Sequence, residues 1–275
     1  MVYKNISWKE YHGALLPQTA PHVKIELTKE EEQELLQLSK AYFLRYVSNW
    51  DQKDTSQFWY VIKSEFSGME ELSSNTRNQV RKGLKHCMVK KVQAAIIANE
   101  GYEVYREAFH NYATYIKPLD KSKFIQMILG SNKSDFWAVY KKDDHKMIAY
   151  SQNFIEDNSI NYSTIKFHPE YLKLYPSYAL FFEMNQYYLS EKNFLYVNDG
   201  ARSISHDTNI QDFLIQKFKF RKSYVKLHVV YRWDVGFVIR ILYPFRTLLS
   251  KVDHKVFNKI SVLLKQEEIR KSFEK

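Results

Sequence analysis

The sequence predicts a protein of the α/β (α+β) class, with a mixed, mostly antiparallel central sheet flanked by helices. Three alternating, strand-like segments follow one another over residues 135–168, and the short polar turns between them are typical of antiparallel hairpins. Strand-like and helix-like segments then alternate as far as residue 232. Such an order indicates a mixed sheet with helices on both of its faces.

The first 87 residues are expected to form a helical and strand segment that packs on the core. Residues 28–47 begin with Thr28 and a run of glutamates, and apolar residues follow at near-helical spacing, which indicates an amphipathic helix. The aromatic and β-branched run at 58–66 indicates a strand.

A basic helix is predicted over residues 73–87, "SSNTRNQVRKGLKHC". Ser73 or Ser74 can cap its first turn. One face is apolar and a separate stripe is basic: the apolar residues are Val80, Leu84 and Cys87, and the basic residues are Arg77, Arg81 and Lys85. By itself this stretch suggests nucleic-acid binding, another anion site or a solvated face.

The core is expected over residues 88–232, in the order β-α-α-β-β-β-α-β-α-β. Its strands are predicted at 88–97, 135–143, 146–156, 159–168, 193–200 and 222–233, and its helices at 100–116, 121–130, 176–192 and 206–220. Pro176 suits the first position of a helix, where a missing N–H costs no hydrogen bond. Residues 233–275 form a basic amphipathic tail that either packs on its own domain or lies on a membrane surface or a partner subunit.

The formal net charge of +10 fits an anionic partner, or simply a basic and soluble surface. Cys87 is the only cysteine, which excludes a disulfide within the chain and a cysteine-based zinc site. The scattered histidines show no ligand spacing, so no metal site is expected. Charges stand where a signal peptide needs an apolar run, and no run is long enough to span a membrane, so a cytoplasmic location is expected.

Two motifs carry a resemblance to a known fold. Residues 72–83 read "LSSNTRNQVRKG", and residues 215–224 read "IQKFKFRKSY". The first is similar to the L-S-x-N-T-R-x-x-(I/V)-R-K helix of FemAB-like proteins, and the second to a K-x-G-F-R pattern that ends a helix in many related transferases. Together with the element order, they resemble the acyl-CoA N-acyltransferase fold, the GNAT superfamily, in its FemAB-like branch.

The chain departs from that family at three places. Residues 171–177 contain no glycine, whereas the superfamily's usual pyrophosphate turn is Gly-rich. Lys219 stands where the resemblance expects glycine. Ile215 stands where many acetyltransferases carry a tyrosine that protonates the leaving thiolate. FemAB-like relatives often lack the glycine pattern as well, and some of them take aminoacyl-tRNA in place of acyl-CoA.

The resemblance implies acyl-CoA (acetyl-CoA) as a co-substrate, without a metal. Its phosphates would lie near the start of the helix at Pro176, and the candidate donor-binding residues are Lys173, Tyr175, Ser177, Tyr178 and Asn209. The basic stripe of the first motif, with Arg77 and Arg81, could help to bind an anionic donor or acceptor.

The polar stretch 197–209, "VNDGARSISHDTN", follows a predicted strand and is the first candidate catalytic region. Asp199 or His206 could act as a general base, and Arg202 could bind an anionic substrate group. The alternative is a simple turn followed by a helix cap.

The second candidate region is residues 165–171, where His168 and Glu170 lie at a strand end and could take part in catalysis. Pro169 makes a simple exit turn an equally good interpretation. In the strand itself, alternation places Tyr162, Thr164, Lys166 and His168 on one face, so Tyr162 and Thr164 are candidates for contact with the substrate.

We therefore expect a transferase that moves an acyl group from acyl-CoA to an amine or hydroxyl of a small molecule, a peptide or a sugar amine. The alternatives are an aminoacyl-tRNA-dependent transferase and a non-catalytic module that binds nucleic acid or anionic lipid through the same fold. The sequence does not fix the oligomeric state.

Overall fold

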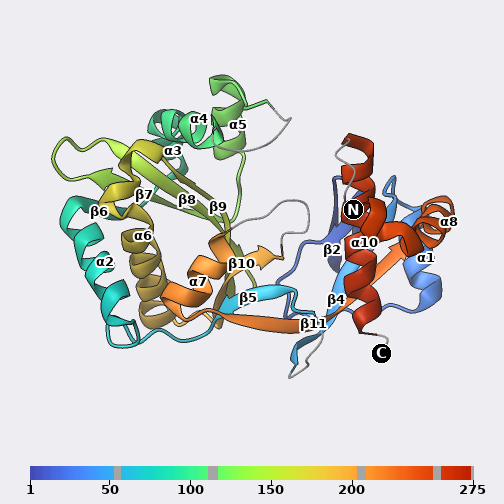
Figure 1. The fold of residues 1–275 in the computed structure, drawn as a ribbon. Helices are drawn as coiled ribbons and strands as arrows, with labels where there is room; N and C mark the ends of the chain where they lie inside the picture. The colour runs from blue at the N-terminus through green and yellow to red at the C-terminus, as the bar shows by residue number, and fades with distance from the viewer. Residues whose placement is uncertain (53–56, 111–116, 203–208, 250–254, 274–275) are drawn as a thin grey trace. The chain divides into compact units, whose positions relative to one another are not determined.

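The computed structural model describes residues 1–52, 57–110, 117–202, 209–249 and 255–273 (Figure 1). Contacts divide the chain into two compact units. The first comprises Met1–Val61, Ala201–Asn209 and Lys222–Lys275, and the second comprises Ile62–Gly200 and Ile210–Arg221. Residues 62–87, which the sequence analysis assigns to the N-terminal segment, thus belong to the second unit, and the three-part division stays a prediction.

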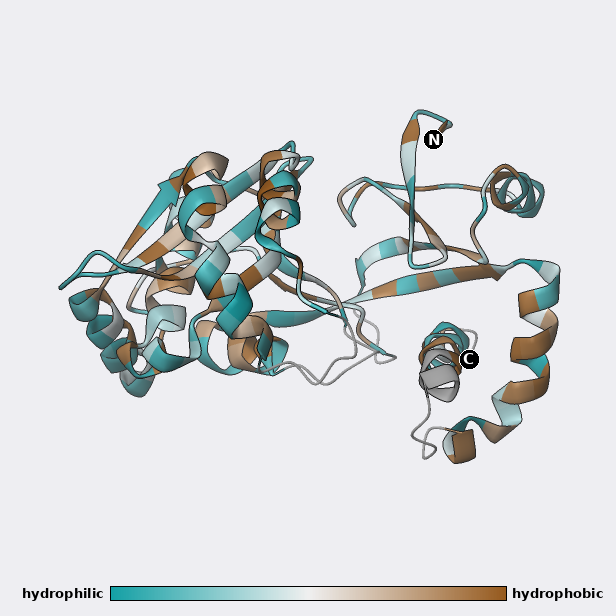
Figure 2. Cartoon of the chain, turned by 90° about the horizontal axis from the view of Figure 1, so that it is seen from above, coloured by the Kyte–Doolittle hydropathy of each residue, from teal (hydrophilic) through white to brown (hydrophobic). Residues whose placement is uncertain are grey.

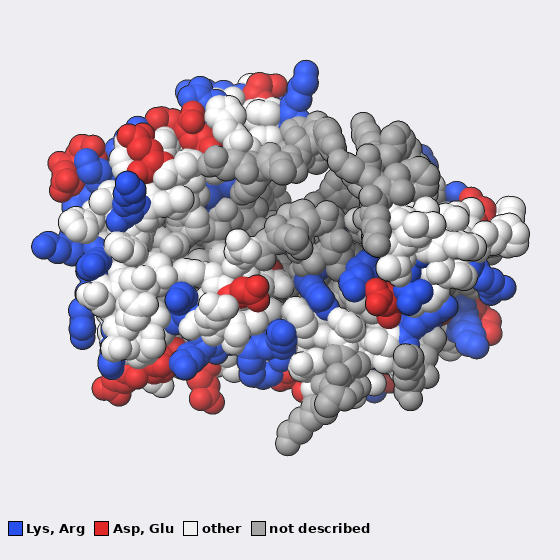
Figure 3. Space-filling view, viewed as in Figure 1, with Lys and Arg blue, Asp and Glu red and all other residues white. Residues whose placement is uncertain are grey.

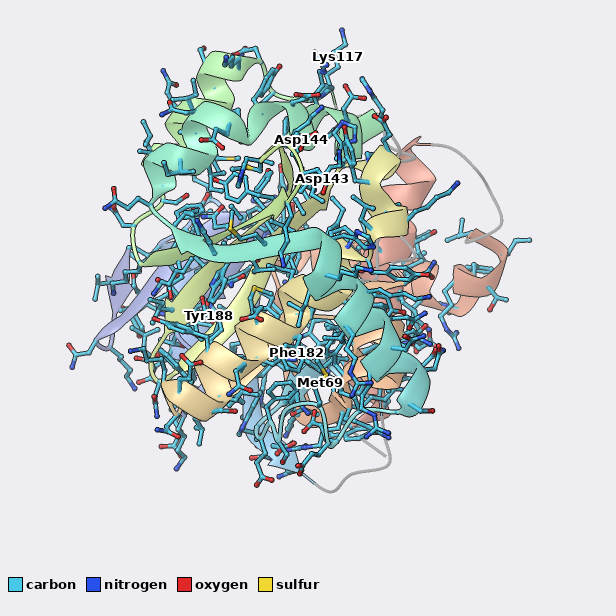
Figure 4. All side chains as sticks on the ribbon, turned by 90° about the vertical axis from the view of Figure 1, so that its left-hand side faces the viewer. Met69, Lys117, Asp143, Asp144, Phe182 and Tyr188 are labelled. Atoms are coloured by element: carbon cyan, nitrogen blue, oxygen red, sulfur yellow. The ribbon has the colours of Figure 1, made fainter. Side chains whose placement is uncertain are left out.

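The second unit contains a mostly antiparallel sheet, with strand order β10-β9-β8-β7-β6. Only β9 and β10 run parallel to each other. The strands are β6 (Cys87–Val92), β7 (Ser134–Lys141), β8 (Met147–Glu156), β9 (Ser159–Phe167) and β10 (Tyr196–Ala201). The predicted fold class is confirmed, and the turn between β7 and β8, where Asp143 and Asp144 lie, joins an antiparallel pair as expected (Figure 4).

Helices cover both faces of this sheet (Figure 1). One face packs on α3 (Ala94–Glu100), α4 (Tyr102–His110) and α5 (Lys121–Leu129), through an apolar cluster that contains Phe124, Phe136 and Tyr150. The other face packs on α6 (Pro176–Asn185), α2 (Ser74–His86) and α7 (Ile210–Phe218). A 3-10 helix, η1 (Pro169–Leu174), leads into α6, and wider π-helical turns, η2 (Gln186–Glu191), follow it.

A polar network is buried on the α6 face. The Tyr188 hydroxyl, on η2 (Figure 4), accepts hydrogen bonds from Trp137 Nε1 at 2.8 Å and Asn153 Nδ2 at 3.2 Å. It donates to Asp135 Oδ2 at 3.1 Å, and Lys91 Nζ lies 2.8 Å from the same oxygen. Because buried polar groups are costly without partners, these bonds fix the position of η2 against β7 and β8.

The first unit contains a smaller sheet with strand order β1-β2-β3-β4-β11. Helix α1 (Lys29–Gln37) covers one face and α10 (Lys255–Ser272) packs on the other. The strands are β1 (Val2–Tyr3), β2 (Ile6–Tyr11), β3 (Ala14–Pro17), β4 (Phe43–Gln52) and β11 (Arg221–Tyr231), and β5 (Tyr60–Lys63) leads from this unit into the second. The remaining helices are α8 (Trp233–Leu242), η3 (Tyr243–Phe245) and α9 (Arg246–Leu249).

Two predicted boundaries are wrong. The helix that begins after Thr28 ends at Gln37, and residues 43–47 belong to strand β4. Leu44 contacts the α1 side and Phe43 the α10 side, so this strand is apolar on both faces and lacks the alternation that would reveal it. The strand expected at 88–97 ends at Val92, and Ala94–Glu100 is helical, since short apolar runs with alanine suit either state.

Candidate functional site

Strands β9 and β10 of the second unit run side by side for three residues and then separate. The pairs are Tyr196 with Ser159, Val197 with Ile160, and Asn198 with Asn161. Asn198 joins the strands at the last pair, because its Nδ2 donates to the Ile160 carbonyl at 3.0 Å and its Oδ1 accepts from the Gly200 N–H at 2.8 Å. β9 continues to Phe167, paired with β8 alone among the described strands. The edge of β9 beyond Asn161 can therefore offer backbone groups to a ligand.

Asp199 lies where the two strands separate. Burial raises the pKa of this carboxyl to about 7, and a hydrogen bond from the Gln211 side chain opposes the shift. Gln211 belongs to the first turn of α7, so this helix orients the carboxyl. A group with a pKa near neutral accepts a proton readily in neutral solution, which suits a general base.

The first turn of α6 forms the second part of the site. Tyr175, the residue before it, has a left-handed backbone (φ 59°, ψ 40°) and makes no side-chain capping bond, and Pro176 has no N–H to donate. The N–H groups of Ser177 and Tyr178 have no acceptor within the helix. The Tyr178 ring meets Phe213 of α7 edge-on, at 5.0 Å between centroids. Because Gln211 and Phe213 share one turn of α7, this helix links Asp199 to the start of α6.

Helix α2 lies against this same turn, and Gly83 allows the approach. A Cβ built on Gly83 would stand 2.6 Å from the Tyr175 carbonyl oxygen and 3.2 Å from Ala179 Cβ. Ser73 caps α2 by accepting from the Thr76 N–H, and Val80 is buried beneath the helix, as predicted. The basic motif therefore ends beside a helix N-terminus, where partial positive charge gathers.

Lys82 is the basic residue of α2 that contacts this turn, with its Nζ 5.8 Å from the centre of the Tyr175 ring. The sequence does not single out Lys82, because basic residues at intervals of four form the stripe Arg77, Arg81 and Lys85 instead. Arg77 is partly buried and Arg81 is exposed. Only the position of Tyr175, far away in the sequence, identifies Lys82.

No protein-family model and no curated protein sequence matches the chain. Solved structures do match it. The structure of FemX has 8% sequence identity and a TM-score of 0.55, and the match covers 85% of each chain. The structure named "C-terminal Domain (DUF2156) of Putative Lysylphosphatidylglycerol Synthetase from Agrobacterium fabrum" has 11% identity and a TM-score of 0.54, and the match covers 86% of this chain and 83% of that one. The fold is GNAT-like, of the FemAB kind. At these identities the likeness concerns the fold alone.

Lys219 stands where the resemblance expects glycine, and its backbone has a conformation that favours glycine. Lys219 follows α7 and has a φ of 59°, in the left-handed region that glycine adopts without strain. This chain therefore has a left-handed backbone at this position with a lysine in place of the glycine that would adopt it without strain. Ile215, at the usual tyrosine position, lies within α7 and has no proton to donate.

His168 and Glu170 lie apart from Asp199. His168 is buried near α4, with Nε2 3.8 Å from Glu103 Oε1, and its Nδ1 has no hydrogen-bond partner among the described residues. Glu170 is exposed on η1. Because α4 covers the opposite face of the sheet from α7, the structure does not bring these two residues together with Asp199 (Figure 1).

The expected common face of Tyr162 and Thr164 is a wrong prediction. Tyr162 pairs with Asn153 and Thr164 with Gln152, so Ser163 is an extra residue that bulges from β9. Gln152 and Asn153 are adjacent in β8, so their side chains point to opposite faces of the sheet. Their partners Thr164 and Tyr162 therefore point to opposite faces as well. Tyr162 is buried against α6, where its hydroxyl donates to Asn185 Oδ1 at 2.9 Å.

The other candidates are placed as follows. Lys173 is exposed on η1, close in sequence to the start of α6. Arg202 belongs to the first unit, where its Nη1 donates to Gln57 Oε1 at 2.6 Å. Asn209 is exposed and also belongs to the first unit, and His206 lies outside the described residues.

Gln211 and Lys82 are the site residues that sequence reasoning missed. Gln211 lies within a predicted helix, and only its bond to Asp199 marks it. In the parts of the chain that the structure describes, no three His, Cys, Asp or Glu side chains are arranged to bind a metal ion.

Proposed function

We propose that this chain transfers an acyl group from a CoA thioester to an amine or hydroxyl acceptor. The observation that carries the proposal is the arrangement of three parts in the second unit. The strands β9 and β10 separate at Asn198, a carboxyl with a raised pKa follows at Asp199, and the uncapped first turn of α6 lies beside the basic helix α2.

The first turn of α6 would bind the donor's phosphates. Ser177 and Tyr178 offer backbone N–H groups, and the helix dipole favours an anion at this end. Lys82 and Lys173 add positive charge near the same turn. The absence of glycine at 171–177 leaves fewer N–H groups for contact than a Gly-rich turn would offer, so side-chain cations contribute more of the binding.

The extended, amide-bearing arm of the donor would lie along the edge of β9, beyond its pairing with β10. Pairing with β10 stops at Asn161, and main-chain groups on a strand edge bind extended chains in the manner of an added strand. A donor held in this way has its phosphates at α6 and its thioester toward the point where the strands separate.

Asp199 would act as the general base. It accepts the proton from the acceptor's amine or hydroxyl as the new bond to the acyl carbon forms. The carbon–sulfur bond of the thioester then breaks, and the thiolate leaves and takes a proton from water, because Ile215 offers none. A thiol has a pKa of about 8.5, so the thiolate is a good leaving group that can depart without a proton. It can then take its proton from water.

Calorimetric titration with CoA tests the donor site. We expect binding by the wild type and a loss of at least fivefold in affinity for Lys82→Glu, since Lys82 is the α2 cation at the site. Lys90→Glu is the control with the same charge change, because Lys90 is exposed on β6. If CoA does not bind the folded wild type, or if both variants lose affinity equally, the proposed donor site is wrong.

Aminoacyl-tRNA is the second candidate donor. It is supported by the likeness to FemX and to the C-terminal domain of a putative lysylphosphatidylglycerol synthetase, and by the glycine-free turn. On the face shown in Figure 3, Lys and Arg are spread among Asp and Glu side chains. Binding of tRNA that weakens steeply with salt, without binding of CoA, would favour this donor.

Binding of either ligand without turnover would favour a non-catalytic module. Both donors are cytoplasmic molecules, and we place the chain in the cytoplasm as part of this proposal.

A further inference from the structure

An apolar surface covers the outer side of the helical segment that follows β11. Helix α8, η3 and α9 follow one another without a break over residues 233–249. The large side chains at every third or fourth position are exposed: Trp233 at 84%, Leu248 at 66%, Phe237 at 63%, Phe245 at 56% and Ile241 at 51%. We call these five residues the α8 face. The same segment appears mostly in the brown of hydrophobic residues in Figure 2.

The spacing makes these residues one stripe. Steps of four, four, four and three residues in a helix keep side chains on the same side. The opposite side of α8 packs on the first unit, where Ile239 is buried. Lone exposed apolar residues need no explanation, but five large ones in a row on one helix side indicate a binding surface.

The charges at the border of the α8 face are positive. Arg240 is exposed beside the stripe and has no ion-pair partner among the described residues. Arg246 and Lys271 both lie over the Tyr243 ring, at 4.5 and 4.0 Å from its centre. The only acid within 233–249 is Asp234, and both of its carboxylate oxygens accept bonds from Arg232 at 2.8 Å. A partner for this surface therefore combines an apolar interior with an anionic border.

A groove continues the apolar surface toward α10. It has a volume of about 740 Å³, and its lining includes the apolar residues Phe237 and Ile239, the cations Arg240, Arg270 and Lys271, and the acid Glu267. Glu267 is ion-paired with Arg270 at 2.7 Å and lies 3.8 Å from Lys271, so the net charge of the groove is positive. Phe237 belongs both to the groove and to the α8 face, so the two form one continuous region.

We propose that the α8 face binds the surface of an anionic phospholipid bilayer. Trp233 and the phenylalanines would enter the boundary between headgroups and acyl chains, while Arg240, Arg246 and Lys271 would meet the headgroup phosphates. Aromatic and basic residues at these two depths are typical of helices that lie in the membrane interface. A second copy of the chain fits less well, since two-fold pairing of this face would bring Arg240 and Arg246 of one copy toward the same arginines of the other.

Sedimentation of the full chain with vesicles tests the proposal. We expect binding to phosphatidylcholine vesicles that contain phosphatidylglycerol, and little binding to phosphatidylcholine alone. Phe237→Asp should reduce the partition coefficient more than tenfold. Leu129→Asp is the matched control, because Leu129 is 54% exposed on α5 of the other unit, and it should bind like the wild type. Arg240→Glu should reduce binding at least fivefold at low salt, whereas Lys121→Glu should not.

A second measurement reports the position of Trp233. Trp8, Trp59 and Trp137 are buried, and Trp50 is half-buried against an apolar cluster of the first unit. Brominated lipids should therefore quench mainly Trp233, which is 84% exposed, and Trp233→Phe should remove most of the quenching. The proposal is overturned if the folded wild type does not bind anionic vesicles, or if Leu129→Asp weakens binding as much as Phe237→Asp. It is also overturned if Phe237→Asp converts a dimer into a monomer while vesicles remain unbound, because the face would then belong to a second copy.

Discussion

Gly83 of α2 lies so close to Tyr175 that a Cβ on Gly83 would stand 2.6 Å from the Tyr175 carbonyl oxygen. This contact brings the basic helix of the first motif to the start of α6. It gives the glycine at the end of that motif a physical reason, since any side chain there would push the two helices apart.

Gly83→Ala should therefore destabilise the fold and weaken donor binding. The added methyl group meets backbone atoms, which cannot rotate away, so we expect a loss of about 1–3 kcal/mol in the free energy of unfolding. Urea denaturation and titration with CoA measure the two effects. Asn78→Ala, at an exposed position of the same helix, should leave both unchanged or slightly raise stability, since alanine favours helices. A Gly83→Ala protein as stable as the wild type would contradict the close contact.

Asp199→Asn should lower turnover and raise stability. Without its base the chain should lose a factor of about 10²–10⁴ in kcat. Because burial raises the pKa of Asp199 to about 7 from an ordinary value of about 3.8, the folded protein binds this proton more tightly than the unfolded chain. The free energy of unfolding therefore falls as the pH rises from about 4 to 7. The variant should escape this fall, with a gain above pH 7 of no more than about 4 kcal/mol.

The control for Asp199 is Glu156→Gln. Burial also raises the pKa of Glu156 to about 7, so this variant should likewise gain stability as the pH rises. Glu156 lies at the end of β8 and has no part in the proposed chemistry, so kcat and its pH profile should not change. Equal losses of kcat in both variants would remove Asp199 as the base.

Lys219→Gly should stabilise the protein. The residue has a φ of 59°, which costs a side-chain-bearing residue about 1–2 kcal/mol, and glycine avoids this strain at the cost of a more flexible unfolded chain. We expect a net gain of up to about 1 kcal/mol in thermal or urea unfolding. Lys217→Gly, inside α7, should do the opposite and lose about 1 kcal/mol. A loss in both variants would show that the Lys219 side chain has a favourable contact that outweighs the strain.

Tyr188→Phe should destabilise the second unit without affecting the donor site. The hydroxyl accepts from Trp137 and Asn153 and donates to Asp135, so its removal leaves buried donors without acceptors. We expect a loss of about 1–3 kcal/mol in urea denaturation. Tyr187→Phe removes a hydroxyl that accepts a hydrogen bond from Lys91 Nζ at 3.1 Å on a half-buried residue, and it should cost less than half as much. CoA affinity should be unchanged in both, since neither residue lies at the start of α6.

The sequence predicted the order of elements from residue 121 to 231 with few errors, because polar turns separate its strand-like runs and Pro176 marks the start of α6. It also predicted the cap and apolar face of α2, the proline at the start of α6 and Asp199 as a candidate base. These features depend on neighbouring residues, and neighbouring residues are what a sequence displays.

Tertiary structure alone decided the rest. Strand β4 is buried on both faces, so its pattern resembles that of a helix until both covering layers are known. Ser163 adds one residue to β9 and reverses the face of every later side chain, which no alternation rule anticipates. Lys82 gains its role from its contact with Tyr175, which lies far away in the chain. Gln211 gains its role from its hydrogen bond to Asp199. The sequence by itself determined which residues could do chemistry, and the packing of helices on the sheet decided which of them meet.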